Sequence, residues 1–188
     1  LDEFTDHVFV HTGQNSDPKL NEVFFEDLEL RDPDYCLNVD TSTMGSVMGD
    51  TIKKSEELFL KEKPDAVMIL GDTNSAIAAV VAERMHIPVY HMEAGNRSFD
   101  NNVPEELNRK MIDHVASFNL PYNDYSMRNL LAEGIHSRYI QKTGSPIKEI
   151  YEYYKGKIAS STAVEDLHLT PNNYFLVSVH RQENVDLP

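Results

Sequence analysis

The segment PVYHMEAGNRSFDNNVPEELNRKMIDH, residues 88–114, shows how this chain folds. It begins with a short apolar stretch that is typical of a buried β-strand and that ends at Glu93 and Gly95. Pro104 then opens a segment with helical period, since proline suits the first helical turn and apolar residues follow at every fourth position from Leu107. A strand followed by a helix is the repeating unit of an α/β fold.

The same alternation continues along the chain. Apolar, β-rich runs predict strands at residues 7–10, 35–39, 66–70, 89–91, 116–120, 139–142 and 174–179. Stretches with helical period lie between most of them, at residues 18–28, 44–63, 75–85, 104–115 and 124–135. Several strands are apolar throughout, as strands buried on both faces are. We therefore predict an α/β, Rossmann-like, doubly wound parallel sheet that binds ligands beyond the carboxyl ends of its strands.

Two of these helices carry more specific expectations. The helix at residues 124–135 has Asp124 as its expected N-cap and Gly134 as its expected C-terminal stop. The helix at residues 44–63 carries an apolar stripe, formed by Met48, Ile52 and Phe59, which could serve either packing or an interface.

The length of the chain bounds its domain organisation. With 188 residues, of which 40% are hydrophobic, it suffices for one full α/β domain and part of another. We expect an N-terminal Rossmann-like domain at residues 1–155, and a crossover with the first strand of a second domain at residues 156–188. A strand buried on both faces needs neighbours, and the last strand has none after it, so we expect the chain to be a fragment of a larger protein.

The charge balance limits the classes of ligand. The chain carries 17 basic and 31 acidic residues, a formal net charge of −14. This argues against general nucleic-acid or anionic-membrane binding, which needs basic surface. It leaves open a small anion held by a few arginines. The sequence contains no run of about 18 apolar residues, so no membrane span is predicted. Residues 1–10 lack the pattern of a signal peptide. Cys36 is the single cysteine and cannot form an internal disulfide, which fits a reducing cytoplasm.

Several common binding motifs are missing from the sequence. It contains neither G-x-G-x-x-G nor G-x-x-x-x-G-K-[ST], so neither dinucleotide-fold nor P-loop phosphate binding is predicted. Its eight histidines form no H-x-H or H-E-x-x-H motif, so we expect no metal site.

Carboxylates and arginines follow the predicted strands. GDTNS places Asp72 after the strand at residues 66–70, HMEAGNR contributes Glu93 and Arg97, and PEELNR contributes Glu105 and Arg109. Partial burial at a strand end can raise the pKa of a carboxylate such as Glu93 and suit it to acid–base chemistry. Each residue also has a structural alternative: Asp72 as a helix cap, and ion pairs of Glu93 with Arg97 and of Glu105 with Arg109.

Six motifs taken in order resemble the non-hydrolysing UDP-N-acetylglucosamine 2-epimerase family along nearly the whole chain. They are HTGQNSD (11–17), GDTNS (71–75), HMEAGNRSFD (91–100), PEELNR (104–109), TGSP (143–146) and HRQEN (180–184). HMEAGNRSFD is most similar to the branch that makes UDP-N-acetyl-L-fucosamine for capsule and O-antigen polysaccharides. That branch usually has Tyr in place of Ser16 and Cys in place of Ser98.

The resemblance implies a two-domain, glycosyltransferase-B-like fold with a UDP-N-acetylhexosamine in the cleft between the domains. The family inverts C2 without a redox cofactor, by eliminating UDP to a glycal-like intermediate and adding it back. Members are often dimers, so a homodimer is expected for the full-length protein.

The resemblance also assigns roles to residues, and it assigns them as a set. The catalytic residues that it implies are Asp72, Glu93, Glu105 and His180. Arg109 matches a substrate-contacting arginine, and His11 and Gln14 lie in a motif that lines the cleft. Arg97 and Arg181 would offset phosphate charge, while the backbone of Gly144 and Ser145 could either bind an anion or form a plain turn.

Three rival functions remain open. A hydrolysing 2-epimerase would release UDP and the free sugar, a glycosyltransferase of the same architecture would need an acceptor, and a non-catalytic binding module would not need the intact acidic set. The resemblance places a first strand with a G-T-R-P-E loop upstream of Leu1 and most of the second domain after Pro188. We therefore expect the 188-residue chain alone to bind UDP-sugar poorly and to turn over little.

Overall fold

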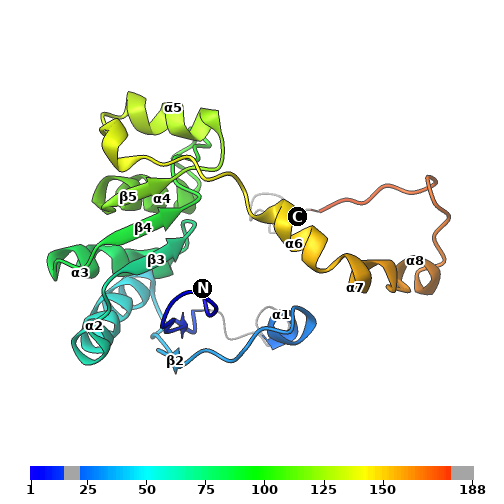
Figure 1. Ribbon diagram of the computed structural model, residues 1–188, viewed down its shortest axis with the longest axis horizontal. Coiled ribbons are helices and arrows are strands. Elements are labelled where there is room, and N and C mark those ends of the chain that lie inside the picture. Colours follow the sequence, from blue (N-terminus) through cyan, green and yellow to red (C-terminus); the bar gives the residue numbers. More distant parts are fainter. Residues whose placement is uncertain (15–21, 179–188) are drawn as a thin grey trace. The chain divides into compact units, whose positions relative to one another are not determined.

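The computed structural model describes residues 1–14 and 22–178, and the chain divides into two compact units, Leu1–Ser145 and Pro146–Pro188 (Figure 1). The domain boundary expected at residues 155 and 156 concerns the complete two-domain fold and stays a prediction.

Parallel strands form the centre of the first unit. β3 (Val67–Leu70), β4 (Val89–Met92) and β5 (Phe118–Leu120) lie side by side in that order. A second pair, β1 (Val10–His11) with β2 (Tyr35–Cys36), is also parallel. A helix lies between the two strands of each pair in the sequence, as the crossover connection of parallel strands requires.

Several strands are shorter than the sequence predicts. β1 and β2 have two residues each where four and five were expected. The strand predicted at residues 139–142 is reduced to a single bridge between Ile140 and Asn119. Residues 174–178, the described part of the last predicted strand, form none. A strand extends only where a neighbour satisfies its backbone groups, and these segments have one such neighbour or none in the part of the chain described.

The helices agree more closely with the sequence. α4 (Pro104–Val115) has the predicted bounds, and α2 (Met44–Glu62) ends one residue early. The segment predicted at residues 75–85 forms a 3₁₀ turn, η2 (Asn74–Ile77), followed by α3 (Ala78–Arg84). The remaining elements in the described residues of this unit are α1 (Glu22–Asp27), α5 (Asp124–Ala132) and η3 (Ser137–Tyr139).

One detail of the helices differs from expectation. The N-cap of α5 is Asn123 and not Asp124: the Asn123 backbone is extended and its side chain accepts a hydrogen bond from Ser126 N at 2.9 Å. In the apolar stripe of α2, Phe59 is buried, while Met48 and Ile52 are partly buried. The other buried residues of α2 are Val47, Thr51, Ser55 and Leu58.

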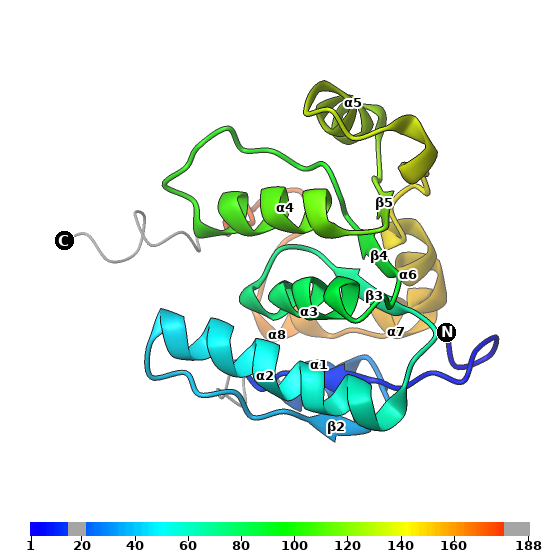
Figure 2. The ribbon, with the colours of Figure 1, turned by 90° about the vertical axis from the view of Figure 1, so that its left-hand side faces the viewer.

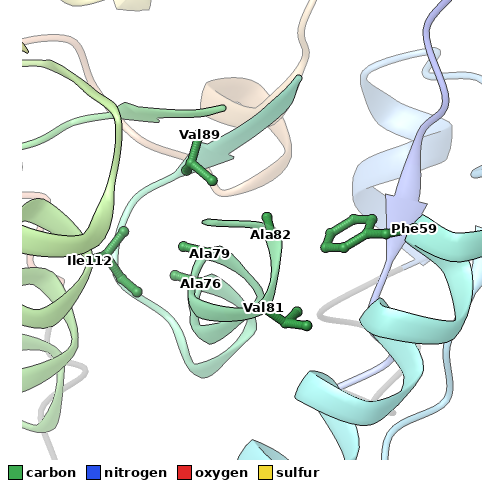
Figure 3. Packing of buried hydrophobic residues seen from close by; sticks show 7 residues of the cluster. All are labelled: Phe59, Ala76, Ala79, Val81, Ala82, Val89 and Ile112. Atoms are coloured by element: carbon green, nitrogen blue, oxygen red, sulfur yellow. The ribbon is translucent and has the colours of Figure 1, made fainter. Parts of the chain in front are cut away.

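The core lies where α3 packs against β3 and β4 and between α2 and α4 (Figure 2). Ala79 and Ala82 of α3 are fully buried, so small side chains let this helix pack closely. Figure 3 shows them with the other members of the cluster: Phe59, Ala76, Val81, Val89 and Ile112. This packing fixes the sheet beneath the loops that follow β3 and β4.

Up to residue 178, the last one described, the second unit contains three short helices, α6 (Ile147–Tyr153), α7 (Lys155–Ala159) and α8 (Ala163–Asp166). None of the helices in the described residues is long and apolar enough to cross a membrane.

Candidate functional site

Two turns at the carboxyl edge of the sheet carry the first two predicted residues. β3 and β4 pair in a register that sets Leu70 opposite Met92. Asp72 and Glu93 therefore leave neighbouring strands at the same level. Glu93 has a φ of 67°, in the left-handed region that costs a non-glycine residue about 1–2 kcal/mol. A strained backbone at this position indicates that the surrounding contacts hold Glu93 in place.

The carboxylate of Glu93 is partly buried and has a polar neighbour. Its Oε1 accepts a hydrogen bond from Asn96 Nδ2 at 3.0 Å. Its Oε2 lies 3.4 Å from the point where a Cβ on Gly71 would stand, so the missing side chain at Gly71 leaves room for it. Burial and then the charge of Glu93 raise the pKa of Tyr122 above its usual value, which places that phenol near the carboxylate.

Arg109 of α4 holds Asp72. Its Nε and Nη2 donate to Asp72 Oδ2 at 2.8 and 2.5 Å, and its Nη1 donates to Glu106 Oε2 at 3.0 Å. Asn108 Nδ2 donates to the Asp72 carbonyl oxygen at 3.0 Å. The Asp72 carboxylate thus pairs with an arginine from the adjacent helix, and the alternative in which it caps its own helix is wrong. The ion pairs of Arg109 are with Asp72 and Glu106.

Glu106 organises the loop that leads into α4. The residue is fully buried. It accepts hydrogen bonds from Ser98 N at 2.9 Å, Ser98 Oγ at 3.1 Å and Phe99 N at 3.2 Å. Burial opposes its ionisation, but these hydrogen bonds, together with Lys110, outweigh burial and lower the pKa of Glu106 to about 2. Glu105, the predicted catalytic residue beside it, lies in the first turn of α4 and is partly buried.

The structure corrects the interpretation of Arg97. Its side chain is buried and donates to Asp113 Oδ2 at 2.7 Å and to both oxygens of Glu133 at 2.7 and 2.6 Å. Burial alone would lower the pKa of Arg97, but these two carboxylates raise it above its usual value. The guanidinium is thus already paired with two carboxylates, which fix the loop that carries it. The alternative in which Arg97 forms an ion pair with Glu93 is wrong, because Glu93 is not among its contacts.

The loop after β1 reaches the same edge. Thr12 Oγ1 and Ser75 Oγ are 2.6 Å apart, and Ser75 Oγ donates to Gln14 Oε1 at 3.4 Å. His11 Nδ1 accepts from Gly13 N at 3.2 Å, so this histidine stabilises its own turn. Gln14 therefore lies next to η2, the turn that begins two residues after Asp72.

The structure gives fewer contacts for the remaining predicted site residues. Thr143 N donates to the Pro121 carbonyl at 3.1 Å, which sets the segment leading to Gly144 and Ser145 beside the turn after β5. His180 and Arg181 lie outside the described residues.

Sequence reasoning missed the support beneath the site. His91 and Asp113 are buried and 2.9 Å apart, and Asp113 meets the backbone of Gly95. A signal was present: Glu106 and Asp113 are seven residues apart, so two acids share one face of α4 with buried Ile112 nearby. Charged residues on the inward face of a helix need partners, which helical period alone does not identify.

An open depression of about 330 Å³ lies beside these residues. The loop at residues 96–98, Arg109 of α4 and the start of α5 line it with polar groups, among them Asn96, Asn123, Ser126 and Asn129. Such a lining can hydrogen-bond hydroxyl and amide groups. Within the described residues, no three histidine, cysteine, aspartate or glutamate side chains are grouped to hold a metal ion.

Comparison with known proteins matches residues 2–188 to the family described as UDP-N-acetylglucosamine 2-epimerase. The chain belongs to this family. UDP-N-acetylglucosamine 2-epimerase from Methanocaldococcus jannaschii is 40% identical over 182 residues, which cover 94% of this chain and 50% of that protein. UDP-2,3-diacetamido-2,3-dideoxy-D-glucuronate 2-epimerase from Pseudomonas aeruginosa is 34% identical over 184 residues, or 96% of this chain and 51% of that protein.

Solved structures of epimerases in the family have the same fold. UDP-N-acetylglucosamine 2-epimerase from Rickettsia bellii has 48% sequence identity to this chain. Its structure superposes with a TM-score of 0.88 and covers 96% of this chain and 48% of that one. The M. jannaschii enzyme in complex with UDP-GlcNAc and UDP is 38% identical, with a TM-score of 0.84 over 95% of this chain and 50% of that one. The predicted Rossmann-like α/β fold, the N-terminal part of a glycosyltransferase-B-type epimerase, is confirmed. The chain spans about half the length of these relatives.

Proposed function

We propose that this chain supplies the sugar-facing half of an enzyme that inverts C2 of a UDP-N-acetylhexosamine. One observation carries the proposal. In a chain of the 2-epimerase family, Asp72 and Glu93 leave adjacent parallel strands at the edge where such folds bind ligands, and Arg109 is bound to Asp72.

The reaction is redox-neutral. A base removes the C2 proton while the bond from C1 to the UDP oxygen breaks, which gives a glycal-like intermediate and free UDP. Return of a proton to the opposite face of C2 and re-addition of UDP at C1 complete the inversion. A general base must reach the proton that it removes, and an acid must assist the leaving phosphate.

Among the acids of the set, Glu93 is the one we assign to the C2 proton. Its recorded partner is the neutral amide of Asn96, and none of the described cationic side chains lies within ion-pair distance of it. Its second oxygen faces the space left by Gly71. Asp72 instead receives two hydrogen bonds from Arg109 on one oxygen, so its role is electrostatic. Glu105 and His180 complete the catalytic set by the family resemblance.

The candidate substrate class rests on the family and on the polar depression lined by Asn96 and Arg109. UDP-GlcNAc is the first candidate, because the M. jannaschii relative is named for it and was solved with it. The P. aeruginosa relative is named for a diacetamido sugar, so substrate varies within the family. The motif HMEAGNRSFD supports the third candidate, UDP-2-acetamido-2,6-dideoxy-L-talose, whose product serves surface polysaccharide synthesis. Cytoplasmic location and a homodimer stay predictions.

Deuterium exchange tests the proposal. The longest natural protein that contains this chain is incubated with each candidate UDP-sugar in D₂O, with the 188-residue chain alone beside it, and C2 is followed by NMR. Deuterium at C2 of an epimeric UDP-sugar is the expected result. Free sugar would show the hydrolysing reaction, and consumption only with an acceptor would show a glycosyltransferase. No exchange with any of the three sugars would overturn the proposal.

Glu93→Gln provides the matched variant. We expect it to lose exchange at C2 by at least about 100-fold, the usual scale of general acid–base catalysis. Glu57→Gln is the same change at an exposed position of α2, remote from the site, and should retain wild-type exchange. Wild-type exchange in Glu93→Gln would remove Glu93 from its assigned role.

A further inference from the structure

Asp113 connects the two turns that carry the proposed catalytic acids. Its carboxylate is fully buried on α4, one helical turn beyond Arg109. It accepts from Gly95 N, with Oδ2 at 3.1 Å and Oδ1 at 3.2 Å, so it holds the turn after β4 two residues from Glu93. Its contact with His91 continues to the turn after β3, because His91 Nε2 lies 2.8 Å from the Gly71 carbonyl oxygen.

The donors and acceptors around His91 determine its hydrogen-bonding role. Nδ1 lies 2.9 Å from Asp113 Oδ1, and Nε2 faces the Gly71 carbonyl oxygen. Both neighbours are acceptors, since a carbonyl oxygen has no proton and Asp113 already receives charge-assisted donation from Arg97 at 2.7 Å. A neutral imidazole has only one N–H, so one of these short contacts would set two lone pairs against each other. Two hydrogen bonds require protons on both ring nitrogens.

The charges of the cluster lead to the same conclusion. Asp113 and Glu133 each carry one negative charge. The single positive charge of Arg97 is shared between these two carboxylates. His114 reaches Glu133 from its exposed side at 3.3 Å. A cationic His91, with only 1% of its side chain exposed, balances the buried carboxylate of Asp113, as a buried charge requires.

Close packing makes this arrangement sensitive to small movements. A Cβ on Gly95 would lie 2.3 Å from the Ser126 carbonyl oxygen and 2.8 Å from Leu130 Cγ. Asn129 Nδ2 donates to the Gly95 carbonyl oxygen at 3.0 Å. The turn after β4 is thus pressed onto α5 on one side and bound to Asp113 on the other. The strained φ of Glu93, two residues earlier, persists because this turn cannot relax.

We propose that Asp113 and a doubly protonated His91 are positioning residues that hold Glu93 and Asp72 at their working separation. The geometry carries the hydrogen-bonding part of this inference. Its catalytic part rests on the proposed function.

The hydrogen-bonding part is tested on the wild-type 188-residue chain at neutral pH, by ¹⁵N–¹H correlation spectra of the histidine rings. We expect both nitrogens of the buried ring to carry protons, with His91→Gln identifying the signals by their loss. One protonated and one unprotonated nitrogen on His91 would overturn the inference. This measurement needs no catalytic activity, so it decides the point even if the proposed function fails.

The positioning role is tested with Asp113→Asn, which keeps the shape of the side chain but puts amide hydrogens opposite the donors of Gly95 or Arg97. Hydrogen exchange at the Gly95 amide should rise by at least about tenfold. In the protein used for the deuterium-exchange test, kcat should fall by at least about tenfold while KM changes by less than about threefold.

His114→Gln is the control for the positioning test, because it removes a histidine from the exposed side of the same cluster. It should leave both readouts within about twofold of wild type. Wild-type Gly95 exchange and wild-type kcat in a folded Asp113→Asn variant would overturn the positioning role.

Discussion

Replacing Glu106 by glutamine tests how strongly the loop before α4 depends on one buried charge. Glu106 is fully buried and receives hydrogen bonds from the backbone of Ser98 and Phe99, with ion pairs to Arg109 and Lys110. The variant keeps the size of the side chain and removes its charge. It also places an amide donor among groups that, apart from the Ser98 hydroxyl, can only donate.

The magnitude follows from the pKa. In the folded chain the pKa of Glu106 is about 2, against an ordinary value of 4.5. A folded pKa below the unfolded one stabilises the fold above the unfolded pKa, and this contribution is lost as pH falls toward the folded pKa. At 1.36 kcal/mol per unit, it amounts to about 3 kcal/mol at pH 7 and falls to about 1.4 kcal/mol at pH 3. Wild type should therefore lose about 2 kcal/mol more than Glu106→Gln over this interval.

Urea unfolding followed by circular dichroism, at several pH values between 7 and 3, measures the difference. Groups that titrate in both proteins cancel in the comparison, so the difference in unfolding free energy reports Glu106. Glu57→Gln on the exposed face of α2 is the matched control and should follow wild type at every pH. A difference between Glu106→Gln and wild type that stays constant from pH 7 to pH 3 would refute the reasoning, because it would mean that Glu106 does not titrate with a lowered pKa.

Three further predictions concern packing and the site. Gly95→Ala forces a Cβ against the Ser126 carbonyl and should cost about 3 kcal/mol or more of unfolding free energy, whereas Gly49→Ala, in open space on α2, should add up to about 1 kcal/mol. Ile112→Ala should lower the unfolding free energy, measured by urea unfolding, by about 3 kcal/mol. Leu107→Ala, at an exposed position of the same helix, should lower it by less than about 0.5 kcal/mol. Equal losses in the two variants would contradict the assigned core. Arg109→Lys keeps the charge but not the forked donation, so C2 deuterium exchange should fall at least about tenfold with the fold retained; unchanged exchange would show that the fork is dispensable.

The sequence predicted those elements of the fold that carry their own periodic pattern. α4 has its predicted bounds because Pro104 starts it and an apolar stripe continues through it. Strand lengths were predicted poorly, since an apolar run does not show whether a neighbour will pair with it. Residues 139–142 begin with Tyr139 and Ile140, both typical of strands, yet only Ile140 forms a bridge. The N-cap of α5 was misplaced by one residue because Asn123 and Asp124 are both good caps and only the backbone decides between them.

Candidate-site residues that directly follow a strand were predicted from the sequence. Residues that are buried beneath the ends of the strands were missed. Asp72 and Glu93 could be placed at a common edge from the alternation of strands and helices alone. The roles of Arg97 and Arg109 could not be separated in the same way, because an arginine's partner depends on tertiary contacts. Arg109 binds the acid at a strand end, while Arg97 turns inward to Asp113 and Glu133.

The pairing of these arginines bears on how an anionic substrate would be held. The chain has a formal net charge of −14, so its surface as a whole opposes a diphosphate. Arg97 is buried between two carboxylates, and Arg109 is shared between Asp72 and Glu106. Neither guanidinium brings uncompensated positive charge to the edge of the sheet. If the proposed function holds, the diphosphate of a UDP-sugar needs cations other than these two, and Arg181 in HRQEN is the candidate that the family resemblance supplies. The residues of the first unit would then meet the sugar ring and its C2 proton.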